Sequence, residues 1–141
     1  MDRIYKTAST LARLLVAVIF LLNGFGVIDQ SVPLKELAAT GVPVEIASLM
    51  VMAGRGLQIV AGLALVFGAY AQFASLALFA FLIPATFTAH AFWKATGTPA
   101  FQGQLVNFSK NLAMMGGLLF IAAREAIGET PWRKPTSSPS P

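Results

Sequence analysis

The chain has no cysteine and a single histidine among its 141 residues. Without thiols it cannot form disulfides, carry out thiol redox chemistry or ligate an iron–sulfur cluster or a metal through sulfur. One histidine cannot supply both axial ligands of a bis-histidine haem or build a histidine-based metal cluster. We therefore predict no metal site and no covalently bound cofactor, and the sequence identifies no catalytic residue.

Charge is also scarce. Charged residues make up 11% of the chain and hydrophobic residues 56%, whereas soluble domains carry about 25% charged residues. The net charge of +4 comes from basic residues at the ends of apolar segments rather than from a patch with interleaved aromatic residues. We therefore predict no nucleic-acid binding. This composition favours lipid, not water, as the solvent of most of the chain.

Four apolar segments account for most of the sequence, at residues 11–28, 46–67, 73–92 and 105–122. A helix rises about 1.5 Å per residue, so about 20 residues cross a hydrocarbon core of roughly 30 Å. The first segment is longer than the apolar core of a signal peptide, and no A-x-A-like cleavage site follows it. We predict an all-α fold, a transmembrane four-helix bundle that retains this first helix.

Basic residues near the segment ends predict the orientation. Residues 1–127 are expected to form the transmembrane domain, and residues 128–141, rich in Pro and Ser, a disordered cytoplasmic tail. The short, uncharged connection at 68–72 predicts a tight antiparallel hairpin. Because Lys and Arg are enriched on the cytoplasmic side, we expect both termini there, which requires an even number of spans. Three basic residues lie before or at the start of the first segment and three follow the last: Arg3, Lys6, Arg13, Arg124, Arg133 and Lys134.

The connection between the first two segments has a helical pattern of its own. Ser31 is suited to cap a short helix, Pro33 to lie in its first turn and Gly41 to end it. Pro43 is suited to start the second membrane helix. We predict a short amphipathic helix that lies on the outer surface of the bundle.

A layer of polar residues interrupts or borders the apolar segments and forms the candidate ligand-binding site. Its members are Asn23, Arg55, Gln58, His90, Trp93, Lys110 and Asn111. In an up-down bundle they fall in the outer half of the membrane, where a deeply placed cation costs about 2.5–3.5 kcal/mol. The four segments contain no acid to neutralise the two cations. Either the site stays electropositive and receives an anion, a quinone carbonyl or a lipid headgroup, or the first connection folds down and pairs the cations with its acids, Asp29, Glu36 and Glu45.

Each of these residues also has a plainer interpretation. Lys110 is shallow enough to extend its amine to the interface. The three amide side chains are of the kind that hydrogen-bonds between membrane helices. His90 beside Trp93 fits an aromatic belt at the membrane surface. Arg55 lies deeper, which favours a binding site or a buried pairing.

Several motifs in this chain are similar to those of a known family. The most specific place polar residues inside apolar helices, at 85–87 with 90–93 and at 107–113. Together with motifs at 11–15, 23–24, 41–43 and 62–68, they make the chain resemble the DoxX family over nearly its whole length, excluding the tail. The resemblance implies a four-helix protein of the bacterial inner membrane, and it implies family-like roles for His90, Trp93, Lys110 and Asn111.

Two positions depart from the family pattern. Gln58 stands where relatives often have a glutamate, and Val27 where a lysine often closes the first helix. Loss of the buried glutamate removes a group that could titrate and serve as a counter-ion. This departure argues against a proton-coupled redox role inherited unchanged.

The resemblance implies a link to quinone-linked sulfur oxidation or to membrane redox and oxidative-stress complexes. Our first hypothesis is a non-catalytic or co-catalytic subunit of such a complex, with quinone as its ligand. Its partners would be other membrane or periplasmic redox proteins, and a homo-oligomer is compatible with the sequence. Two alternatives remain open: a structural or assembly subunit with a lipid- or anion-binding pocket, and, less favoured, a small transporter.

Overall fold

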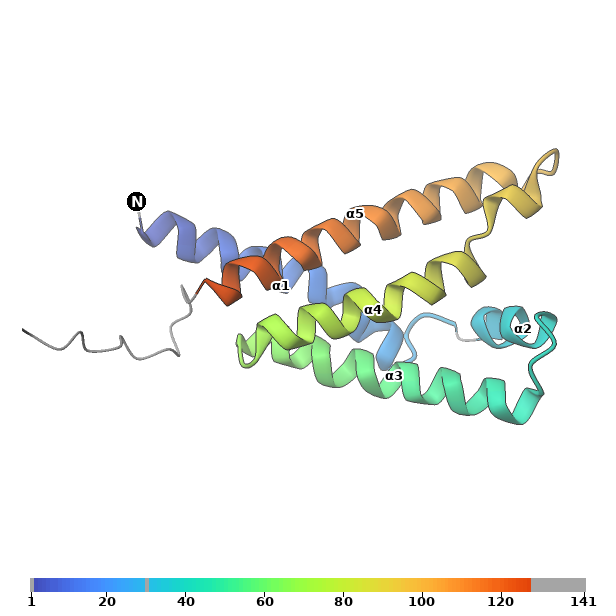
Figure 1. The fold of residues 1–141 in the computed structure, drawn as a ribbon, viewed down its shortest axis with the longest axis horizontal. Helices are drawn as coiled ribbons and strands as arrows, with labels where there is room; N and C mark the ends of the chain where they lie inside the picture. Colours follow the sequence, from blue (N-terminus) through green and yellow to red (C-terminus); the bar gives the residue numbers. More distant parts are fainter. Residues whose placement is uncertain (1, 30, 128–141) are drawn as a thin grey trace, which may run out of the picture.

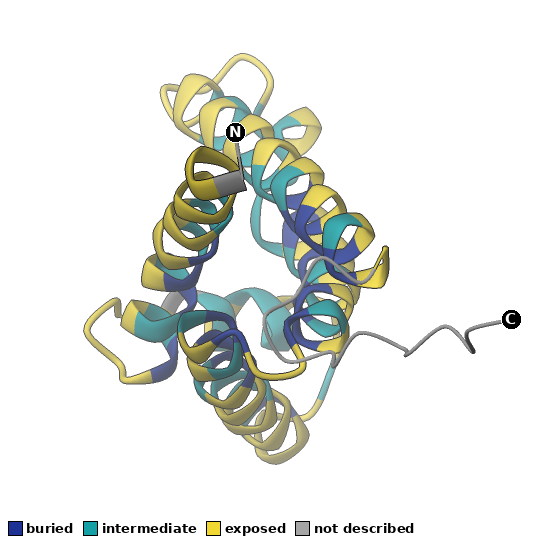
Figure 2. Ribbon diagram, turned by 90° about the vertical axis from the view of Figure 1, so that its left-hand side faces the viewer, coloured by how far each residue is buried: buried dark blue, intermediate teal, exposed yellow. Residues whose placement is uncertain are grey.

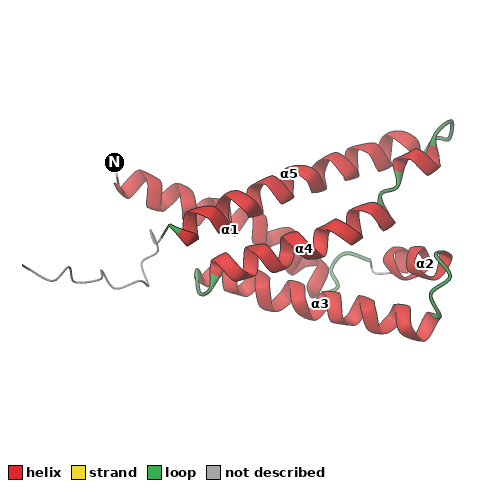
Figure 3. Ribbon diagram, viewed as in Figure 1, coloured by secondary structure: helices red, strands yellow, loops and turns green. Residues whose placement is uncertain are grey.

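The structure, a computed structural model, describes residues 2–29 and 31–127 and consists of helices joined by short loops (Figure 3). The elements in chain order are α1 (Asp2–Gly24), α2 (Ser31–Ala39), α3 (Val44–Phe67), α4 (Ala71–Ala89), the 3-10 helix η1 (Phe92–Ala95) and α5 (Phe101–Ala126). No strand occurs in these two ranges, which confirms the all-α prediction. The predicted tail at 128–141 lies outside the described residues.

Four stretches are long and apolar enough to cross a membrane, as predicted: α1, α3, α4 together with η1, and α5. All four membrane helices begin before the apolar segments read from the sequence, and α1 and α5 extend the furthest beyond them. α1 begins at Asp2 because its polar first turns contain no helix breaker, and α5 continues to Ala126 for the same reason.

The third membrane helix ends earlier than its hydropathy indicates. α4 stops at Ala89, and His90 follows as its C-cap with φ −127° and ψ 44°. Trp93 lies beyond this break, in η1. The spacing of Thr86, His90 and Trp93 predicts that they share one stripe of a continuous helix, and this prediction is wrong because the backbone leaves the α-helical conformation between them.

The four long helices run alternately up and down (Figure 1). α1 packs mainly on α3 and α5 mainly on α4, while α3 and α4 pack on each other and α1 touches α5 less extensively. α1 begins and α5 ends at the same end of the bundle, where the Arg124 guanidinium lies 5.9 Å from the centre of the Tyr5 ring. We call this the terminal end, and the opposite end, which carries α2 and η1, the α2 end (Figure 1). The even number of spans is confirmed.

The connections at both ends of α3 match their predicted positions. The hairpin from α3 to α4 turns through two residues with positive φ, Gly68 at 71° and Tyr70 at 53°. α2 forms where the sequence predicts it, and Gly41, with φ 89°, follows its end. Its N-terminal cap differs from the prediction: Asp29 Oδ1 accepts the Ser31 N–H at 2.9 Å and Oδ2 accepts the Ser31 hydroxyl at 2.6 Å.

The side chains are distributed as expected for a protein in lipid. Buried residues face one another inside the bundle, and exposed residues cover its outside (Figure 2). The outer surface is largely apolar, with Leu15 74% exposed, Val60 70% and Phe73 66%. Water-soluble monomers rarely expose apolar surface so extensively. The outer face therefore contacts the acyl chains of a bilayer.

Small residues allow close approach between the helices, as is usual in membrane bundles. A Cβ added to Gly54 of α3 would lie 2.9 Å from the Phe81 ring of α4, and one added to Gly62 would lie 2.8 Å from Leu21 of α1. The seven-residue spacing of Gly54, Ala61 and Gly68 predicts one small-residue face on α3, and in the structure Gly54 packs on α4 and Gly68 on the Arg13 guanidinium of α1. The sequence also predicts close contacts at Gly116 and Gly117 of α5. This is correct for Gly117, whose added Cβ would contact Val16 at 3.7 Å, but wrong for Gly116, which has open space.

An ion pair that the sequence analysis missed holds the terminal end together. Arg13 Nη1 donates to Glu125 Oε1 at 3.1 Å, and both residues are only 8% exposed. The guanidinium also packs on Gly68, where an added Cβ would lie 2.8 Å from Nη1. Because Gly68 ends α3, this one side chain joins α1 to both α5 and α3. Arg13 was assigned above to the cytoplasmic flank, but it lies within the α1 helix and faces the interior.

Candidate functional site

Arg55 binds the end of α1 instead of a carboxylate. Its Nε donates to the Gly24 carbonyl at 3.0 Å, and its Nη2 packs on Gly26, which has φ 76° and where an added Cβ would lie 2.7 Å away. The guanidinium is thus held against the backbone at the end of α1. A cation at a helix C-terminus is stabilised by the helix dipole and by the unpaired carbonyls there. Asn23, in the same last turn of α1, is half-buried.

This contact predicts a stability effect for Arg55. We expect Arg55→Ala to lower the free energy of unfolding by about 1–2 kcal/mol, because a charge-assisted hydrogen bond and a dipole contact are both lost. The measurement is equilibrium unfolding in mixed micelles, followed by circular dichroism. Lys110→Ala is the control, since Lys110 is exposed and a surface substitution changes stability by about 0.5 kcal/mol or less. Equal losses in the two variants would contradict this role of Arg55.

The other amides of the predicted site serve the helices themselves. Gln58 is 5% exposed, and its Nε2 donates to the Gly54 carbonyl of its own helix at 3.2 Å. Asn111 joins two helices: its Nδ2 donates to Thr86 Oγ1 at 3.0 Å, from α5 to α4. Asn111 thus makes the interhelical hydrogen bond that was one of its two interpretations.

Arg55 and Asn111 lie well inside the bundle, as expected from the sequence. Not all of the predicted site residues, however, face its interior. Arg55 lies 11 residues after Val44, and Asn111 lies 10 residues after Phe101, which places both roughly 15 Å from the starts of their helices. Lys110 is exposed on the outside of α5, whereas Asn111 faces α4. The structure therefore does not bring Lys110 together with the polar side chains inside the bundle.

His90 forms a second group of polar residues, nearer the α2 end. Its Nδ1 lies 3.0 Å from Oε1 of Gln104, in the first turn of α5. An amide oxygen only accepts hydrogen bonds, so this contact places a proton on Nδ1. In the neutral ring Nε2 is then an acceptor, and in the imidazolium it becomes a donor. The sequence predicted His90 as a ligand-binding residue but did not identify Gln104 as the group that fixes its tautomer.

Glu36 of α2 completes this group and was not predicted as a site residue. α2 packs on α3 and on α4, so the first connection does fold onto the bundle. Burial raises the pKa of the Glu36 carboxyl above its ordinary value, while the nearby charge of His90 lowers it by a smaller amount. Oε2 of Glu36 is buried and has no hydrogen-bond partner within the described part of the chain. Of the three acids in the connection, Glu36 is therefore the one that interacts with His90.

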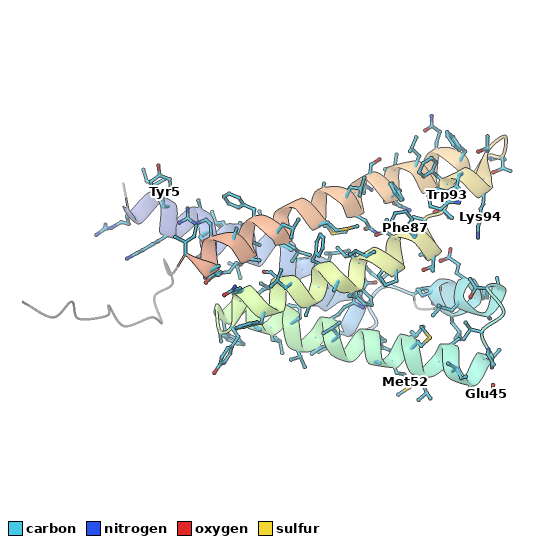
Figure 4. The ribbon with its side chains drawn as sticks, viewed as in Figure 1. Tyr5, Glu45, Met52, Phe87, Trp93 and Lys94 are labelled. Atoms are coloured by element: carbon cyan, nitrogen blue, oxygen red, sulfur yellow. The ribbon has the colours of Figure 1, made fainter. Side chains whose placement is uncertain are left out.

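Trp93 belongs to a cluster of aromatic rings beside this group. Its ring centre lies 5.2 Å from that of Phe92, 6.0 Å from that of Phe87 and 5.9 Å from that of Phe108 on α5. Trp93 is 45% exposed, and Figure 4 shows it with Phe87 and Lys94 at the α2 end, opposite Tyr5. This placement fits the aromatic-belt interpretation and puts exposed rings next to the His90 group.

These observations define a class of protein: a four-span membrane bundle with polar side chains grouped in the half that a short surface helix covers. A family model, DoxX, matches residues 8–91, which is more than half of the chain, and the chain belongs to the DoxX family. The match covers α1 to α4, and the motif at 107–113 on α5 lies outside it. Searches of curated proteins and of solved structures found no match.

Proposed function

We propose that this protein is a membrane subunit of a quinone-linked redox system and that Glu36, His90 and Gln104 bind the quinone headgroup. The observation that carries the proposal is the buried Oε2 of Glu36, which has no hydrogen-bond partner among the described residues and belongs to a carboxyl that the charge of His90 influences. A buried polar atom without a partner costs about 1–3 kcal/mol, and a ligand group that bonds to it would offset this cost.

A quinone headgroup suits the side chains that are present. Its carbonyls accept hydrogen bonds from an imidazolium or a protonated carboxyl, and the hydroxyls of its reduced form donate to a carboxylate or a neutral ring nitrogen. The rings of Phe92 and Trp93 lie next to His90 in the chain and offer aromatic surface for the headgroup. The apolar tail of the ligand would remain in the bilayer.

In this proposal the chain supplies binding and orientation, and a partner protein with a flavin or haem exchanges the electrons. We also propose that the membrane is the bacterial inner membrane, with the terminal end in the cytoplasm and the α2 end outside. The basic residues at the terminal end support this orientation through the cytoplasmic enrichment of Lys and Arg. Partners would then reach the site from the periplasmic side.

One observation favours a second candidate, a structural or assembly subunit. The Arg55 guanidinium is bound to the Gly24 carbonyl, so the deepest cation of the predicted site is used in helix packing. In that case the exposed Trp93 and Lys110 would contact lipid or a partner, and no small molecule would bind at the α2 end.

Equilibrium binding of decylubiquinone to the protein in nanodiscs distinguishes the two candidates. We expect saturable binding that His90→Phe weakens about tenfold or more, a loss of about 1.4 kcal/mol. Lys94→Gln is the matched control, because Lys94 is exposed at the same end and should change the affinity less than about twofold. Unsaturable partitioning of the quinone, or equal affinities of wild type and His90→Phe, would contradict the proposed function.

A further inference from the structure

Glu36 occupies an unusual position for an acid in a surface helix. α2 lies across the ends of α3 and α4, and it holds one carboxyl oxygen of Glu36 buried near His90. His90 is itself fixed by Gln104 at 3.0 Å, so its ring cannot turn freely. Two groups that can exchange protons thus lie close enough to interact electrostatically, and Oε2 of Glu36 makes no hydrogen bond among the described residues.

The other charged groups around Glu36 leave His90 as its main electrostatic neighbour. Lys35 on α2, Glu45 at the start of α3 and Lys94 on η1 are all exposed to solvent. Arg55 on α3 is half-buried but bonded to the Gly24 carbonyl. Of these charges, that of His90 is the one that lowers the pKa of the Glu36 carboxyl, against the larger effect of burial, which raises it.

We infer that Glu36, together with His90, makes the site distinguish the reduced from the oxidised form of a quinone and makes that preference depend on pH. The inference rests on the proposed function, because it concerns how the same site selects its ligand. It assigns a specificity-determining role to a residue of α2, outside the membrane-spanning helices.

The chemistry follows from the two protonation states of the carboxyl group. An ionised Glu36 only accepts hydrogen bonds, so it binds a hydroquinone hydroxyl and repels the carbonyl oxygen of a quinone. A protonated Glu36 donates to that carbonyl instead. The change of preference with pH is therefore assigned to the Glu36 carboxyl, while the Nδ1–H of His90 is held by Gln104. No covalent bond of the ligand changes in this binding step.

The thermodynamic linkage between proton binding by Glu36 and ligand binding gives the direction of the pH effect. As pH rises and Glu36 loses its proton, the affinity for hydroquinone increases relative to that for quinone. Because burial raises the pKa of Glu36, the change occurs at a higher pH than for a solvent-exposed carboxyl.

The test measures dissociation constants of oxidised and anaerobically reduced decylubiquinone for the protein in nanodiscs. From about pH 5 to about pH 8, we expect the preference for the reduced form to rise about fivefold or more in wild type. In Glu36→Gln it should change less than about twofold over this range, because an amide does not titrate. Glu36→Asp should keep the pH dependence with weaker binding, and Glu45→Gln, an exposed acid at the same end, should behave like wild type.

The outcomes of this experiment distinguish a failure of this inference from a failure of the proposed function. If both forms bind saturably but the preference does not depend on pH, or depends on it equally in Glu36→Gln, the inference is wrong and the quinone site stands. If neither form binds saturably to wild type, both are wrong. Circular dichroism and thermal unfolding of each variant establish that it is folded, and Glu36→Asp supplies the comparison if Glu36→Gln is not.

Discussion

Replacing Arg13 with alanine is expected to lower the free energy of unfolding by about 3–5 kcal/mol, because it leaves the buried carboxylate of Glu125 without a partner. The two atoms lie 3.1 Å apart between helices at opposite ends of the chain. The contact of the guanidinium with Gly68, at the end of α3, is lost as well. Unfolding by denaturing detergent in mixed micelles, followed by circular dichroism, measures this loss.

Two further variants separate charge from packing at this position. The double variant Arg13→Met with Glu125→Met removes both charges and keeps apolar volume, so it should lie within about 1 kcal/mol of wild type or above it. Arg3→Ala, an exposed residue of the same helix, should change stability by about 0.5 kcal/mol or less. If the double variant is as unstable as Arg13→Ala, the effect comes from packing and the ion-pair account fails.

Replacing Gly24 with alanine is expected to cost about 1–3 kcal/mol, through overpacking where α1 meets α3. An added Cβ would lie 2.6 Å from Cγ1 of Ile59, 3.1 Å from its backbone N and 3.2 Å from the carbonyl oxygen of Arg55. The side chain of Ile59 can move, but the two backbone atoms can yield only if the helices separate. Thermal unfolding in detergent reports the change.

A glycine on the neighbouring helix α3 provides the control for the Gly24 substitution. Gly56 has no atom within 4 Å of an added Cβ, so Gly56→Ala should stabilise the protein by about 0.4–1 kcal/mol by restricting the unfolded chain. Because Arg55 Nε donates to the Gly24 carbonyl, Gly24→Ala and Arg55→Ala should also be non-additive. If Gly24→Ala is as well tolerated as Gly56→Ala, the α1–α3 contact is looser than described.

The sequence predicts the membrane architecture well because hydropathy and turn chemistry are local properties. Four spans, the hairpin at Gly68 and the short helix α2 all follow from residues close together in the chain. The constant rise of an α-helix also allows depth to be counted from the sequence, which predicts Arg55 deeper than Asn111, whereas the helix bounds of the structure place the two at similar levels. These features need no knowledge of which helices are neighbours.

Partners between helices could not be predicted in the same way. Arg13 and Glu125 are 112 positions apart and lie near the edges of apolar segments, where a charge is ordinarily taken to mark the membrane surface. Lys110 and Asn111 are adjacent in sequence, yet one faces outward and the other faces α4. The rotation of each helix, which decides these contacts, depends on packing against helices elsewhere in the chain.

At the candidate site, the surroundings of Glu36 could not be predicted from the sequence either. Its position on a short surface helix gives no signal that one of its carboxyl oxygens is buried beside His90. The family resemblance implies a titrating acid at position 58, inside the bundle, but this chain has a glutamine there. The structure instead supplies an acid from α2, outside the spans.

The central claim, that a quinone headgroup binds at the α2 end, is tested most directly by photolabelling the protein in nanodiscs with an azido-ubiquinone and mapping the labelled residues by mass spectrometry. The account predicts label on α2 and on residues 86–104, the region around His90 and Gln104, and its loss when excess decylubiquinone competes. Label spread over the lipid-facing surfaces, or concentrated at the terminal end near Arg13, would contradict it.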